Sequence, residues 1–87
     1  MQNVITVKSA EYVTDHILSV TFNDGVKADI DFTRWIEKYP FFAPLRDVEY
    51  FKNFSLDGWT VSWPNGADVA PETLHKMAVR SLENVSA

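Results

Sequence analysis

The sequence of 87 residues contains no cysteine, only three glycines and no excess of basic residues. Without cysteine there is no disulfide framework, no thiol nucleophile and no cysteine-ligated zinc, and a reducing cytoplasm is the expected location. No run approaches the roughly 20 apolar residues that a membrane-spanning helix needs, and we expect no signal peptide. Twelve acidic against eight basic residues give a net charge of −4, so direct binding to nucleic acid is not expected.

Large apolar side chains, by contrast, are plentiful. Hydrophobic residues make up 46% of the chain and aromatic residues 14%, which excludes a disordered or collagen-like chain. A chain of this size can bury roughly 64% of the surface that it exposes when unfolded, enough for one modest core. We therefore predict one domain over residues 1–87, too small to divide into a catalytic and a substrate-binding domain.

Alternating patterns predict an N-terminal hairpin. Apolar and polar residues alternate over residues 18–22 and again over 26–32, which is the period of half-buried strands. Facing residues lie on the same side of a sheet, so the turn must bring the two apolar sets opposite each other. A three-residue loop does this by pairing Phe22 with Val26, and it places Gly25 at the left-handed position of a bulge.

Residues 54–69 predict a three-stranded meander with two tight turns. A two-residue turn at Asp57-Gly58 would pair Leu56 with Trp59. The second connection, Pro64-Asn65-Gly66, is expected to be a three-residue loop, because proline presets its first position and glycine accepts the left-handed conformation at its last.

The remaining segments complete an α+β fold. Residues 4–13 are expected to form a strand that pairs with the first hairpin. An apolar stripe at helical spacing predicts a helix over residues 32–39, ended by Pro40, and a second helix opens at Pro71; a single helical turn is expected at 48–53. We predict a single antiparallel sheet of about five to six strands, with one short middle helix and one C-terminal helix packed on it.

Four segments give the chain a familiar order. They are F-N-D-G-V at residues 22–26, P-L-R-D at 44–47, F-x-x-F at 51–54 and W-P-N-G-A-D-V-A-P-E-T-L at 63–74. This order resembles a small bacterial family known only as domain of unknown function 2442. The resemblance spans roughly residues 4–76, and the run at 63–74 is its most specific part.

The family has no established activity, so the resemblance implies no chemistry. What it implies is a regulatory setting. Some longer members look like this domain followed by a helix-turn-helix module, and others resemble partners in toxin–antitoxin-like gene pairs. This chain ends shortly after its last predicted helix, so we expect no DNA-reading module in it. The family assigns no catalytic role to any residue of the run.

Only a few of the titratable residues are candidates for a binding or catalytic site. Asp68, Glu72 and His75 lie around the start of the last helix and could form a small binding or acid–base group. The simpler interpretation of Asp68 is a helix cap, and that of Asp29 and Asp31 is a solvated strand face. With two histidines and none of the usual ligand spacings, no metal and no cofactor are expected.

The surplus of aromatic residues indicates an interface. Most of the twelve aromatic side chains are expected in the core, but the apolar segment at residues 41–45 falls outside predicted regular structure. Exposed apolar segments mark interfaces more often than catalytic sites. The candidate contact residues are Trp35, Tyr39, Phe41, Phe42 and Leu45.

Three functional hypotheses follow. The first is a non-enzymatic protein-interaction module, which either self-associates, for example as a dimer, or docks a protein partner. The second is an antitoxin-like or transcription-associated accessory that acts on the product of a neighbouring gene. The third is a small enzyme or ligand binder that uses Asp68, Glu72 and His75.

Overall fold

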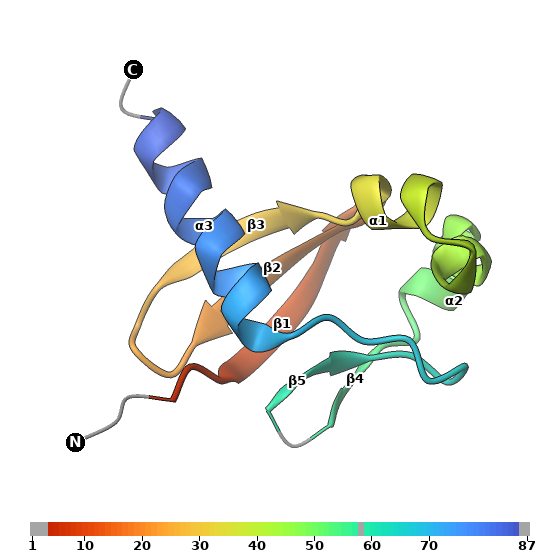
Figure 1. The fold of residues 1–87 in the computed structure, drawn as a ribbon, viewed down its shortest axis with the longest axis horizontal. Helices are drawn as coiled ribbons and strands as arrows, with labels where there is room; N and C mark the ends of the chain where they lie inside the picture. Colours follow the sequence, from red (N-terminus) through yellow and green to blue (C-terminus); the bar gives the residue numbers. More distant parts are fainter. Residues whose placement is uncertain (1–3, 58, 86–87) are drawn as a thin grey trace.

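The computed structural model of the protein describes residues 4–57 and 59–85. Its elements, in chain order, are β1 (Val7–Thr14), β2 (Ile17–Phe22), β3 (Lys27–Asp31), α1 (Thr33–Lys38), the 3-10 helix η1 (Pro40–Arg46), α2 (Val48–Phe51), β4 (Ser55–Asp57), β5 (Thr60–Ser62) and α3 (Pro71–Val85). Figure 1 shows α3 crossing one face of the sheet β1-β2-β3, with α1, η1 and α2 gathered at one end of its strands. The fold is α+β, as predicted.

The N-terminal sheet has the predicted strands, and β2 and β3 pair in the predicted register. Strands β1, β2 and β3 are antiparallel neighbours in sequence order. The loop between β2 and β3 has three residues: the Phe22 amide donates to the Val26 carbonyl over 2.8 Å, and Gly25 has a φ of 94°. The register therefore follows from burying both apolar sets on one face.

The second hairpin has a different register from the predicted one. Strand β4 pairs with β5 so that Leu56 faces Val61 and Asp57 faces Thr60, whereas the prediction paired Leu56 with Trp59. The pairing is shifted by one residue on each strand, which leaves Trp59 in the connection instead of opposite Leu56. As a result its side chain is 63% exposed.

The predicted single sheet of five to six strands is divided into two. Within residues 4–57 and 59–85, sheets of three and two strands form, and a hydrogen bond from the Val7 amide to the Trp59 carbonyl, 2.8 Å long, links them. The loop after β5 has the predicted three residues, since the Trp63 amide donates to the Ala67 carbonyl. Beyond it the chain makes an isolated bridge between Ser62 and Asp68 instead of a third strand of the meander.

The core includes a cluster of aromatic rings from Phe32, Phe51 and Trp63. The Phe51 and Trp63 rings stack with centroids 5.7 Å apart, and Phe32 meets Trp63 edge to face at 5.5 Å. The Trp63 indole Nε1 donates to the buried Phe51 carbonyl over 2.8 Å. In the described part of the chain no buried side-chain nitrogen or oxygen lacks a hydrogen-bond partner, which is the rule for well-packed cores.

None of the helices within the described ranges has the length and apolar character needed to cross a membrane.

Candidate functional site

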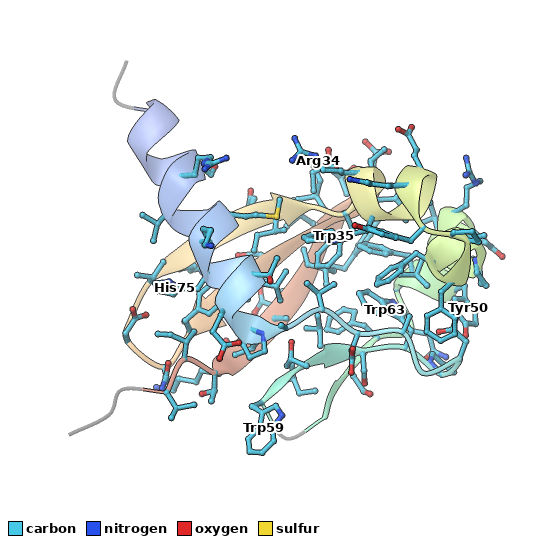
Figure 2. The ribbon with its side chains drawn as sticks, in the orientation of Figure 1. Arg34, Trp35, Tyr50, Trp59, Trp63 and His75 are labelled. Atoms are coloured by element: carbon cyan, nitrogen blue, oxygen red, sulfur yellow. The ribbon has the colours of Figure 1, made fainter. Side chains whose placement is uncertain are left out.

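Three partly exposed aromatic side chains, Trp35, Tyr39 and Phe41, form what we call the aromatic surface. Helix α1 ends before Pro40 because the preceding residue, Tyr39, is extended, with φ −115° and ψ 121°; residues before proline favour this conformation. The break turns Tyr39 and Phe41 outward, with 45% and 57% of their surface exposed, while Trp35 is half-buried. Figure 2 shows Trp35 between α1 and the connection that leads to α3.

Two of the five predicted interface residues belong to the core instead. Residues 41–45, which were predicted to lie outside regular structure, belong to the 3-10 helix η1. In such a helix, residues three apart lie on the same side. Phe42 and Leu45 are therefore both directed inward; Phe42 is 8% exposed and Leu45 is fully buried. Trp35, Tyr39 and Phe41 remain as candidate contact residues.

A hollow of about 370 Å³ lies beside the aromatic surface. Its wall on one side comes from α1 and η1, and on the other side from the connection between β5 and α3 and the first turn of α3. The lining residues are Trp35, Tyr39, Phe42, Asp68, Val69, Ala70 and Thr73. The hollow thus combines aromatic rings and short apolar side chains with one carboxylate.

The turn at residues 64–66 contacts the aromatic surface at Phe41. The Asn65 Nδ2 donates to the Phe41 carbonyl over 3.1 Å, and the Asn65 Oδ1 accepts from the Ala67 amide over 3.0 Å. Gly66 has a φ of 91°, and a Cβ atom added there would lie 3.8 Å from the Phe41 Cζ. The turn and η1 are therefore in direct contact, so the segment that carries the resemblance also holds Phe41 in place.

The Asp68 carboxylate does not act as the expected cap. At the start of α3 the Thr73 and Leu74 amides bond to the Ala70 carbonyl. Asp68 is exposed, and its side chain forms neither a hydrogen bond nor an ion pair with any residue in ranges 4–57 and 59–85. A carboxylate at the mouth of the hollow is thus available to an external group.

Glu72 and His75 do not join Asp68. They line a different hollow, of about 410 Å³, together with Ile5, Lys76, Val79 and Arg80. The His75 Nε2 lies 2.8 Å from the Asp24 Oδ2, and Figure 2 shows His75 on α3, away from Trp35. The three residues predicted as one binding or acid–base group are therefore divided between two places.

The contact between Asp24 and His75 ties the β2–β3 turn to α3. The Val26 amide donates to the Asp24 carboxylate and, with His75 beside it, holds the pKa of Asp24 below its usual value. The His75 ring also meets Phe22 edge to face, with centroids 5.0 Å apart. These contacts give His75 a structural role in joining the sheet to the helix.

Other titratable residues also have structural partners. The Asp31 Oδ1 accepts from the Thr33 amide at the start of α1 over 2.9 Å, and the His16 Nε2 lies 2.9 Å from the Arg46 carbonyl. Within the described ranges no three histidine, aspartate or glutamate side chains converge in a way that could hold a metal ion.

Trp59 is an exposed aromatic residue that the sequence analysis missed, because the predicted register placed it on a strand. It projects from the connection between β4 and β5 at the opposite side of the molecule from α1 (Figure 2). With Val4, Ile5, Pro71 and Glu72 it lines a hollow of about 250 Å³. The signal available in the sequence was the alternative pairing of Asp57 with Thr60; Gly58, part of the predicted turn, lies outside the described residues.

Comparison with known proteins gives a family without a function. Residues 7–79 match a family model described as "Protein of unknown function (DUF2442)", which confirms the resemblance noted from the sequence. Searches of curated proteins and of solved structures gave no significant match.

Proposed function

We propose that this chain, which belongs to the DUF2442 family of proteins of unknown function, is a non-enzymatic module that docks a protein partner on its aromatic surface. The observation that carries the proposal is that Trp35 and Tyr39 line one hollow, and that the exposed Phe41 ring contacts Phe42, which lines the same hollow. Aromatic residues are enriched at interfaces, where a few of them supply most of the binding energy.

The division of the titratable residues also favours docking over catalysis. A general acid or base must lie within hydrogen-bond reach of the group it serves, and several such groups must converge on one place. Asp68 lines one hollow, whereas Glu72 and His75 line another and His75 contacts Asp24. The small-enzyme hypothesis needs all three in one place and loses its main support.

The supporting turn gives the aromatic surface a fixed shape. Asn65 and Gly66 hold the Phe41 segment against the rest of the chain, and Phe41 in turn meets the buried Phe42 ring at a centroid distance of 6.4 Å. A surface that is ordered before binding loses less conformational entropy when a partner docks. The antitoxin-like or transcription-associated role would use this same surface, with a partner encoded nearby.

The test compares two exposed aromatic positions. The purified protein, its Phe41→Ser variant and its Trp59→Ser variant are used as baits, and each retained protein is then purified and its affinity for the three baits measured. We expect a partner that binds the wild type and Trp59→Ser alike and binds Phe41→Ser at least about tenfold more weakly, as for a residue central to an interface. A partner that depends on Trp59 and not on Phe41 would show that the proposed surface is wrong.

Self-association is the other form of the same proposal. Sedimentation equilibrium over a wide concentration range measures it directly, again with both variants. Dimers that dissociate in Phe41→Ser would identify a second copy of this chain as the partner. A wild-type protein that stays monomeric and retains no protein through Phe41 contradicts the interaction module altogether.

A further inference from the structure

We infer that the hollow beside the aromatic surface receives a cationic side chain, arginine or lysine, from the docking partner. The inference rests on the proposed function and specifies the partner's chemistry at this site. It follows from the joint presence of a free carboxylate, Asp68, and the rings of Trp35 and Tyr39 in one hollow.

The carboxylate supplies the first half of the recognition. Asp68 has no ion-pair partner among the residues that the structure describes, yet it stands beside aromatic and short apolar side chains. A partner that covers the hollow would remove water from this carboxylate, and burying an unpaired charge is unfavourable. A partner that brings a positive charge avoids that loss, and the chain's net charge of −4 would favour its approach.

The rings supply the second half. Aromatic faces attract cations, and tryptophan does so best. The chain itself shows that this surface accepts an ammonium group, because the Lys38 Nζ lies 5.7 Å from the centre of the Tyr39 ring. Lys38 is therefore a competitor within the chain: an arriving cation would share Tyr39 with it, or use the half-buried Trp35 ring.

The size and lining of the hollow suit one long side chain. Its volume, about 370 Å³, is near the lower end of the range of roughly 300–1,000 Å³ for sites that hold small molecules. Val69 and Ala70 offer apolar contacts for the methylene groups of lysine or arginine, whose charged end can remain at the mouth with Asp68. The Thr73 hydroxyl is a further acceptor for a guanidinium or ammonium hydrogen.

The experiment uses short peptides of matched shape. Acetyl-Gly-Arg-Gly-amide is titrated into the 15N-labelled protein while the indole N–H signal of Trp35, assigned with Trp35→Phe, is followed; the citrulline peptide serves as the neutral isostere. We expect the arginine peptide to shift the Trp35 signal in a saturable way, and the citrulline peptide to bind about fivefold more weakly or worse.

Charge variants locate the effect. Asp68→Asn should weaken the arginine peptide about fivefold and leave the citrulline peptide unchanged, while Asp29→Asn, an exposed carboxylate on β3, should change neither. Lys38→Gln should strengthen the arginine peptide about twofold, because it removes the competing ammonium from Tyr39.

Any of three results with the peptides overturns the inference: no shift of Trp35 with the arginine peptide, equal binding of arginine and citrulline, or equal binding to wild type and Asp68→Asn. A protein partner that depends on Phe41 but not on Asp68 would also overturn it, while leaving the docking module intact. Conversely, specific arginine binding without any partner that depends on Phe41 would support the site and refute the proposed function, so the two failures are distinguishable.

Discussion

Replacing Asn65 by alanine removes both hydrogen bonds of its side chain, one to the Phe41 carbonyl and one from the Ala67 amide. Each such bond contributes about 0.5–1.5 kcal/mol net, with the exposed bond to Phe41 expected at the low end. We therefore expect Asn65→Ala to lower the free energy of unfolding by about 1–2 kcal/mol. In a domain of this size each kcal/mol corresponds to about 4–8 °C in Tm.

Asn65→Asp separates the two bonds. It keeps an acceptor for the Ala67 amide in both protonation states, so the two states differ mainly at the Phe41 carbonyl. There the protonated carboxyl can donate, whereas the ionised form sets a second acceptor against that carbonyl, and we therefore expect the pKa of the new carboxyl to be raised on folding. Such a group contributes most below its unfolded pKa and loses that contribution as the pH rises through its folded pKa. The stability deficit of Asn65→Asp should therefore shrink on acidification, whereas that of Asn65→Ala should not.

Urea unfolding monitored by tryptophan fluorescence at several pH values measures both effects. An Asn65→Ala variant within about 0.3 kcal/mol of the wild type, well under the value of one bond, would refute the idea that this turn anchors Phe41. An Asn65→Asp deficit that does not change with pH would refute the assigned donor.

Three further substitutions test other contacts. Trp63→Phe leaves the buried Phe51 carbonyl without its donor, so urea unfolding should show a loss of at least about 1–3 kcal/mol; an unchanged midpoint would contradict this hydrogen bond. Gly66→Ala should cost about 1–2 kcal/mol from its φ of 91° alone, because a Cβ at 3.8 Å from Phe41 is in ordinary contact; thermal unfolding measures it. The pKa of Asp24 is lowered on folding, mainly by the Val26 amide, so its contribution is complete above the usual value of 3.8 and lost as the pH falls through the folded value. In acid unfolding followed by circular dichroism, Asp24→Asn should lose less stability than the wild type as the pH falls. Equal losses in the two proteins would argue against a lowered pKa of Asp24.

Apolar patterns and turn residues predicted the register of the first hairpin correctly and that of the second wrongly. At residues 22–26 only the three-residue loop buries both apolar sets, so the sequence allows one register. At residues 56–61 two registers each bring apolar residues together, and the observed one exposes Trp59. In the observed register the Trp59 carbonyl accepts a hydrogen bond from the Val7 amide, a contact between distant segments that short-range patterns do not contain.

The candidate site was predicted in part, for a similar reason. Trp35, Tyr39 and Phe41 were identified by composition and by the break at Pro40, but the same argument included Phe42 and Leu45, because it did not anticipate the three-residue period of η1. The meeting of η1 with the turn at 64–66 joins segments far apart in the sequence. The grouping of Asp68 with the aromatic rings depends on that meeting, so sequence reasoning placed Asp68 with Glu72 and His75 instead.

The central claim, that the aromatic surface is where a partner docks, is tested most directly by site-specific photo-crosslinking in cells that express the protein naturally. A photoreactive phenylalanine analogue is placed at position 41, at position 39 or, as the control on the opposite side, at position 59. The account predicts the same discrete adduct with one protein from positions 39 and 41 and not from position 59. An adduct from position 59 alone, or none from 39 and 41, would contradict it.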